Sequence, residues 1–163
     1  MRAADFDRLY AEHAQPLFGF LAYRLGDRAL AEDLLADTFE RALGSRGRFD
    51  RRRGSEKSWL YSIALNLLRD HQRRRGAEQR ALERASAGQV LTGPDPGLER
   101  AERRSQLGPA LELLAEEERE ALALRFGADL KVPEIAKLIG EPLTTVEGRV
   151  YRALRKLREG VTE

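Results

Sequence analysis

Residues 131–158 read KVPEIAKLIGEPLTTVEGRVYRALRKLR, and this stretch decides the fold of the C-terminal part of the chain. Ile135 and Ile139 lie on the apolar face of a short predicted helix. Gly140 follows at a position where a helix commonly ends with positive φ, and Pro142 comes at the distance expected beyond such a stop. The stretch therefore predicts a helix, a tight glycine turn and a second helix.

The second helix of this stretch combines an apolar stripe with a basic face. Thr144 is its expected N-cap, and Glu147 completes the spacing of a capping box. Its buried stripe is expected at Val146, Val150, Leu154 and Leu157. Its remaining face carries Arg149, Arg152, Arg155 and Lys156. This pattern indicates a helix-turn-helix whose second helix could enter a DNA major groove, and an ordinary αα-hairpin with solvated arginines is the alternative.

The composition suits small helical domains. The chain has 163 residues, of which 42% are hydrophobic and 34% charged, with a formal net charge of +2. No segment shows sustained period-two alternation, so the expected fold class is all-α. Cysteine is absent, which excludes disulfides and thiolate metal sites. No apolar run approaches a membrane span, and the expected location is the cytoplasm, without membrane insertion.

Enzyme chemistry finds little support in the sequence. His13 and His71 are the two histidines, and neither has a metal-binding spacing. No glycine-rich phosphate loop or nucleophile-elbow motif is present. We therefore expect no catalytic residue, no metal and no cofactor.

The N-terminal part predicts two amphipathic helices. The first spans about 5–25, with a kink or break at Pro16, and the second spans about 28–43. The second helix is expected to bury Leu34 and Phe39 and to expose a row of acidic residues. That acidic row is either a solvated face or a docking surface for a basic partner.

A basic loop and a third helix follow. Residues 44–56 hold five arginines around Phe49, which suits contacts to phosphate with one aromatic ring for a base, or simply a solvated loop. The third helix is expected to start near Ser55 or Ser58 and to pack Trp59 at its core edge. An arginine run near its end also has a structural explanation, because the helix dipole favours cations there.

The rest of the chain predicts a linker and a second domain. Residues 1–76 form the first expected domain, 77–104 a flexible linker with a Gly-Pro-Asp-Pro-Gly break, and 105–163 the second. Inward-facing positions of the second domain are expected at Leu107, Leu111, Leu114, Leu122, Leu124 and Phe126. No large interface between the domains is evident, so their relative orientation is expected to vary.

The order of motifs resembles the extracytoplasmic-function group of bacterial RNA polymerase sigma factors. The motifs are AEDLLADTFERAL, WLYSIALNLLRDHQRRR after a loop, and VPEIAKLIGEPLTTVEGRVYRALRKLRE after a linker. The resemblance implies a first domain of the region 2 type, which binds core polymerase and the minus-ten element. It implies a second domain of the region 4 type, which reads the minus-thirty-five element.

The resemblance also implies three sets of site residues. Facing the clamp helices of the largest polymerase subunit would be Asp33, Leu34, Asp37, Phe39 and Arg41. Meeting the melted minus-ten strand would be Phe49, Asn66, Arg69, Asp70, Arg73 and Arg74. Meeting the minus-thirty-five duplex would be Thr144, Thr145, Glu147, Arg149, Arg152, Arg155 and Lys156.

Several positions depart from the family pattern. Leu43 stands where the first motif commonly has tryptophan, and Ser62 and Leu65 stand where arginines often follow the second motif. Glu147 replaces a cation that would face DNA. It either caps the recognition helix, accepts a hydrogen bond from a cytosine amino group, or weakens DNA binding.

The function implied by the resemblance is that of a dissociable specificity subunit without a catalytic site. Its expected partners are core RNA polymerase, through the clamp helices and the flap, promoter DNA and an anti-sigma factor. It is expected to be a monomer when free. The alternative is a helix-turn-helix transcriptional regulator that acts without core polymerase.

Overall fold

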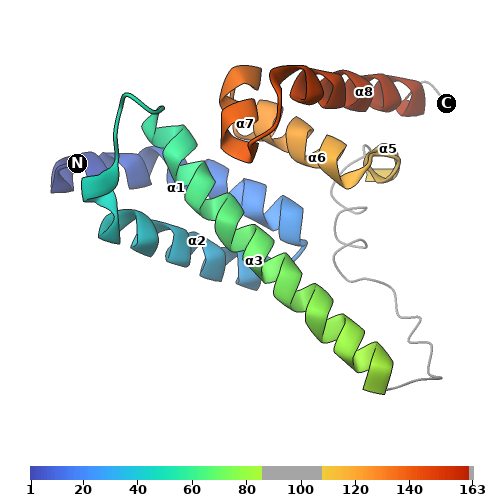
Figure 1. Ribbon diagram of the computed structural model, residues 1–163, viewed down its shortest axis with the longest axis horizontal. Coiled ribbons are helices and arrows are strands. Elements are labelled where there is room, and N and C mark those ends of the chain that lie inside the picture. The colour runs from blue at the N-terminus through green and yellow to red at the C-terminus, as the bar shows by residue number, and fades with distance from the viewer. Residues whose placement is uncertain (86–107, 162–163) are drawn as a thin grey trace.

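The computed structural model describes residues 1–85 and 108–161, and both ranges are helical without any strand. The first range holds α1 (Ala3–Leu25), α2 (Arg28–Gly44), the 3₁₀ turn η1 (Arg46–Arg48) and α3 (Glu56–Ala85). The second holds α5 (Gly108–Glu112), α6 (Glu116–Leu122), the π-helical turn η2 (Ala123–Gly127), α7 (Val132–Ile139) and α8 (Leu143–Val161). The expected all-α fold class is confirmed, with α1–α3 and α5–α8 forming two helical units (Figure 1).

Local signals set the helix ends of the first unit. Gly26 adopts the left-handed conformation (φ 67°) that closes α1, and the Asp27 side chain then accepts a hydrogen bond from the Leu30 N–H at 3.2 Å. Ser55 Oγ accepts from the Ser58 N–H at 3.1 Å, which confirms Ser55 as one of the two expected caps of α3. Pro16 lies inside α1, which continues past it, so of the two expected alternatives the break is wrong.

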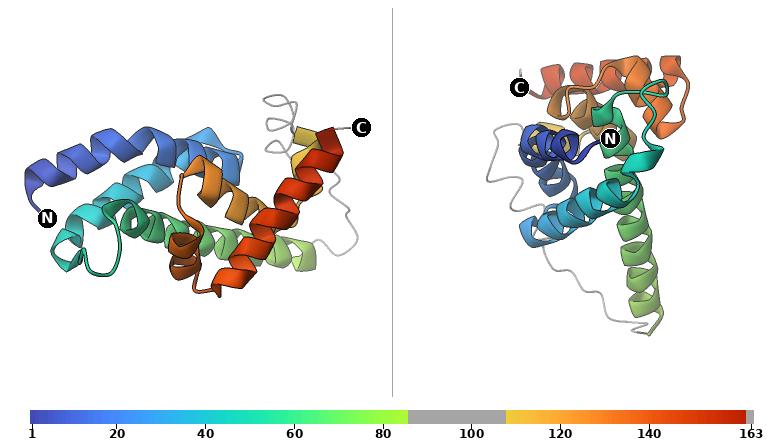
Figure 2. Two further views of the ribbon diagram at one scale, coloured as in Figure 1. Left: turned by 90° about the horizontal axis from the view of Figure 1, so that it is seen from above. Right: turned by 90° about the vertical axis from the view of Figure 1, so that its left-hand side faces the viewer.

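The helix α3 is longer than expected. It continues through residues 77–85, which were assigned to the linker, and its second half extends away from the other helices (Figures 1 and 2). Residues 86–104, with the break at 93–97, and Leu107 lie outside the described residues. The long helix therefore continues beyond the packed part of the first unit.

The core of the first unit lies where α1, α2 and α3 meet. Leu9, Leu17 and Leu68 are fully buried, and the rings of Phe20 and Tyr61 pack edge to face at 5.6 Å between centroids. Burial raises the pKa of Tyr61 to about 12. The sequence pattern did not single out Tyr61, although it lies two positions after Trp59, which was expected at the core edge.

The core of the second unit differs from the sequence pattern at two positions. Phe126 was expected to face inward but is 55% exposed, because the chain forms a π-helical turn there and Ala128 N–H bonds to the Ala123 carbonyl five residues back. Leu154 was expected in the buried stripe of α8 but is also largely exposed, and Ala153 is buried in its place. A small side chain at position 153 suits the close packing of α8 against α6.

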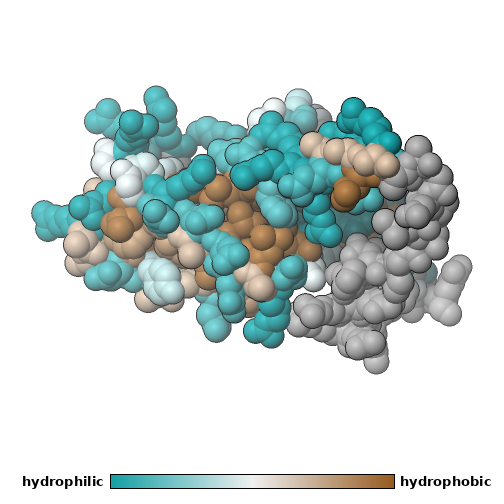
Figure 3. Space-filling view, turned by 90° about the horizontal axis from the view of Figure 1, so that it is seen from below, coloured by the Kyte–Doolittle hydropathy of each residue, from teal (hydrophilic) through white to brown (hydrophobic). Residues whose placement is uncertain are grey.

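The two units contact each other through buried side chains, an interface that the sequence pattern did not indicate. The turn η2 contacts α1, and α7 contacts α3, which joins both units in one cluster of buried side chains (Figures 1 and 2). The Lys57 ammonium donates to the Asp129 carbonyl at 3.1 Å, and the Lys137 ammonium donates to the Arg53 carbonyl at 3.4 Å. The surface in Figure 3 is mainly hydrophilic around a central apolar area.

Candidate nucleic-acid interface

The helix-turn-helix forms as expected around one glycine. Gly140 has φ 71° and ψ 31°, and its N–H bonds to the Ala136 carbonyl at the end of α7. The next helix begins two residues earlier than expected, at Leu143, because the Pro142 carbonyl accepts from the N–H groups of both Thr145 and Val146. The turn therefore joins two helices that contact each other, in the order helix, turn, helix that the sequence predicted.

The position of this helix start corrects the expected capping box. Thr144 lies within the first turn of α8 instead of preceding the helix, so its predicted role as N-cap is wrong. The Glu147 side chain is exposed and makes no hydrogen bond or ion pair to the described residues. Capping does not explain Glu147, and contact with a base or weaker DNA binding remain as its two alternatives.

The basic side chains of α8 differ in their exposure. Arg152 and Arg155 are exposed. Arg149 is only 20% exposed and lies 3.7 Å from the Glu141 carboxylate in the turn. Lys156 donates to the nearly buried Glu118 of α6 at 2.9 Å, so it holds α8 onto α6. Its place among the DNA-binding residues stays a prediction.

An aromatic side chain on α8 was not among the residues that the sequence pattern singled out. Tyr151 lies between the basic positions and is 67% exposed, more than most large apolar side chains of this protein. The signal that could have found it is its place beside Val150 and outside the apolar stripe. An exposed aromatic ring on a basic helix face suits packing against nucleic acid.

The residues expected at the minus-ten strand lie on two neighbouring segments. Phe49, in the basic loop, packs against Trp59 with ring centroids 5.2 Å apart. Asn66 and Arg74 are exposed on α3, and Arg73 forms an ion pair with Asp70 one turn away. The aromatic pair and the α3 positions thus belong to one helix and the loop that leads into it.

Arg69 differs from the other members of this set. Its guanidinium contacts the Glu120 carboxylate of α6, in the second unit, at 3.3 Å. A cavity of about 650 Å³ lies beside it, lined by Asn66, Arg69, Gln72, Arg73 and Glu116. Carboxylates of the second unit therefore reach the surface that was assigned to DNA.

The five residues expected to face polymerase divide into two groups. Asp33, Asp37 and Arg41 are exposed on α2, which lies on the side of the first unit away from α8 (Figure 1). Leu34 and Phe39 are only 6% exposed and belong to the core, where the Phe39 ring packs against Tyr10 and Phe6. The expectation that these two face a partner is corrected, because the apolar side of an amphipathic helix packs inward.

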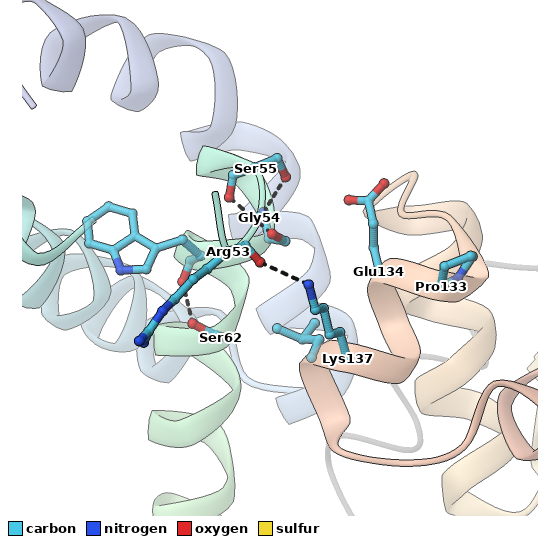
Figure 4. A pocket seen from close by; sticks show the side chains of 10 residues that line it. Arg53, Gly54, Ser55, Ser62, Pro133, Glu134 and Lys137 are labelled. Atoms are coloured by element: carbon cyan, nitrogen blue, oxygen red, sulfur yellow. Dashed lines mark hydrogen bonds between the residues drawn. The ribbon is translucent and has the colours of Figure 1, made fainter. Parts of the chain in front are cut away.

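A second hollow marks the junction of the units. It has a volume of about 430 Å³ and lies between the start of α3 and α7, with Trp59, Pro133 and Leu138 among its apolar walls. Figure 4 shows Lys137 crossing from α7 to the Arg53 carbonyl beside this hollow. The hollow is thus part of the contact between the two units.

The described ranges hold neither a metal site nor a membrane span. Within residues 1–85 and 108–161, no three His, Asp or Glu side chains gather as a metal site requires. None of the helices there is long and apolar enough to cross a membrane.

Comparison with known proteins decides the family. A family model described as Sigma-70 region 2 matches residues 9–78, and one described as Sigma-70, region 4 matches residues 104–157. ECF RNA polymerase sigma factor BldN of Streptomyces coelicolor is 32% identical over 157 residues, which are 95% of this chain and 60% of BldN. RNA polymerase sigma factor CarQ of Myxococcus xanthus is 36% identical over 94% of this chain and 87% of its own. The chain belongs to the extracytoplasmic-function group of sigma factors.

Solved structures share the fold of this sigma factor. The sigma factor RpoE from Bartonella quintana, in complex with the anti-sigma factor NepR, matches with a TM-score of 0.76 at 24% identity, over 97% of both chains. CnrH, in complex with the cytosolic domain of CnrY, matches with a TM-score of 0.68 at 27% identity, over 99% of this sigma factor and 90% of CnrH. The similarity in fold therefore extends over both helical units of this chain.

Proposed function

We propose that this protein is a dissociable promoter-specificity subunit of bacterial RNA polymerase. The observation that carries the proposal is that both sigma regions match in the expected order, and that each coincides with one helical unit. In this role the first unit binds polymerase and captures the melted minus-ten strand. The second unit reads the minus-thirty-five duplex with α8.

The polymerase contact is assigned to the exposed side of α2. Asp33, Asp37 and Arg41 supply charged groups there, and the side chains of these three residues make no hydrogen bond or ion pair to the described residues. The buried Leu34 and Phe39 contribute by fixing the helix on the core. A charged helix face of this kind suits the clamp helices of the largest polymerase subunit as partner.

Promoter reading is divided between two kinds of contact. Arg152 and Arg155 can reach phosphates, which contributes affinity without sequence information. Side chains near the start of α8, such as Thr145 and Arg149, would meet base edges in the major groove. On the first unit, Phe49 and the α3 positions would hold unstacked bases and the backbone of the single strand.

The proposed role has no catalytic step. Bond-making chemistry stays in the polymerase. The protein would act in the cytoplasm, where it would meet the polymerase. The complexes of RpoE with an anti-sigma factor and of CnrH with CnrY support an anti-sigma factor as a further partner of this chain. The free protein would be a monomer.

Transcription in vitro tests this proposal. Core polymerase is incubated with a pool of bacterial promoters, with and without this protein, and the transcripts are sequenced. New start sites that share sequence upstream support the role, and their absence would contradict it. Co-purification with core polymerase separates a sigma factor from a regulator that binds DNA alone.

A further inference from the structure

Two carboxylates of the second unit lie on two arginines of the first. Glu120 of α6 places one oxygen 3.4 Å from Arg24 and the other 3.3 Å from Arg69. Glu116, one turn earlier on α6, lies 3.5 Å from the same Arg24 guanidinium. Two acidic groups thus neutralise two basic groups that come from α1 and α3.

The contact between Arg24 and Glu120 is sheltered from solvent. The Arg24 side chain is only 6% exposed and that of Glu120 only 16%, whereas Arg69 is 41% and Glu116 69% exposed. Screening by salt is weaker for such pairs than for exposed ones, and loss of one partner would leave an unmatched charge. The Arg24 Nε has no hydrogen-bond partner among the described residues, so this arginine is held by its charge contacts.

The carboxylates also border the surface assigned to the single strand. Glu116 lines the 650 Å³ cavity together with Asn66, Arg69 and Arg73. An arginine–carboxylate contact uses the same N–H groups that an arginine uses to bind phosphate. A nucleic-acid strand would therefore compete with Glu120 for the Arg69 guanidinium, whose Nη2 lies 3.3 Å from the carboxylate.

We propose that Glu116 and Glu120 are an internal competitor for DNA, and that Arg24 is a further strand-binding residue which they cover. In the packed form the two carboxylates lie where phosphate groups of a bound strand would contact Arg24 and Arg69. Separation of the units removes them and leaves two neighbouring cations free for an anionic strand. The inference rests on the proposed function in assigning Arg69 to the minus-ten face.

The test compares Glu120→Gln with Glu117→Gln. Both changes remove one negative charge from α6, but Glu117 is exposed and makes no hydrogen bond or ion pair to the described residues of the first unit. Because the chain has no cysteine, spin labels can be placed at cysteines introduced for Ala36 and Lys131, which are exposed on α2 and before α7. Distances between the labels are measured in the free protein, and binding of a random single-stranded DNA pool is measured by fluorescence anisotropy.

We expect Glu120→Gln to broaden the distance distribution and to tighten single-strand binding at least about fivefold, the lower end of typical coupling between sites. Glu117→Gln should give the same label distances as the parent protein, and it should tighten single-strand binding much less than Glu120→Gln does. Adding Arg24→Gln to Glu120→Gln should reverse most of the gain. Circular dichroism verifies that each variant keeps its helices.

Two results would overturn the proposal. The first is a distance distribution of Glu120→Gln that coincides with that of the parent protein. The second is a gain in affinity that Glu117→Gln reproduces, since this would reflect net charge alone. A failure of the proposed function is seen separately, as the absence of transcripts when the parent protein is added to core polymerase.

Discussion

Arg149 and Arg155 both belong to α8, but their surroundings differ. Arg149 is mostly covered and lies near Glu141 of the turn. It belongs to the N-terminal half of the helix that would enter the groove. Arg155 is 59% exposed and lies two turns further along. A restrained arginine suits recognition of one base, whereas an exposed one suits contact with phosphate.

This contrast predicts different losses for the two residues. Arg149→Ala should weaken binding to a minus-thirty-five duplex by roughly 1–3 kcal/mol and relax preference at one position. Arg155→Ala should weaken all sequences alike and reduce the salt dependence of binding. Binding to a duplex library at several salt concentrations measures both effects. Equal losses without any change of sequence preference would show that Arg149 reads no base.

At the scale of elements, the helix-turn-helix depends on the backbone conformation of one glycine. Gly140 has φ 71°, whereas Gly148 lies inside α8 with helical neighbours. A Cβ at Gly148 would meet only the end of the flexible Arg152 side chain, at 3.0 Å. The backbone conformation at position 140 therefore favours glycine, whereas the conformation at position 148 does not.

Alanine at these two positions should therefore have opposite effects on stability. Gly140→Ala should lower the free energy of unfolding by about 1–2 kcal/mol, because alanine is strained at positive φ. Gly148→Ala should raise it by about 0.5–1 kcal/mol, since glycine is unfavourable inside a helix. Urea unfolding of both variants measures the difference. Similar changes in both would contradict the assigned turn.

The element α2 carries its own prediction. Asp37→Arg should abolish binding to core polymerase. Helicity should not change, and the free energy of unfolding should stay within about 0.5 kcal/mol of the parent, because the side chain is exposed. Asp7→Arg on α1 makes the same charge change at another exposed acid and serves as the control. A pull-down with core polymerase that retains the Asp37 variant would contradict the docking face.

At the scale of the whole molecule, the two units pack against each other, and groups that we propose to bind the promoter are partly covered. Arg69 is paired across the interface, and the two lysine-to-carbonyl contacts hold the start of α3 near α7. If Arg69 binds the minus-ten strand as proposed, this form does not present that surface fully. The proposed function then requires polymerase to favour a form with separated units.

Binding of polymerase should consequently change the distance between the units. Labels at positions 36 and 131 should give a narrow distribution in the free protein and a longer distance after core polymerase is added. Separation is expected because the two promoter elements lie apart on the DNA. An unchanged distance in the complex would mean that the packed form is the active one.

The sequence alone determined many helix ends, the glycine turn and the family, because the signals for these features act over a few residues. Ser55 as a cap, the positive φ of Gly140 and the length of α2 follow from local turn and helix chemistry. The order of the three motifs along the chain was enough to indicate the family. Only the tertiary structure placed Glu120 on Arg69, 51 positions apart in the chain, and turned Phe126 outward. Contacts of that kind depend on how complete helices pack, and no short-range pattern in the sequence encodes them.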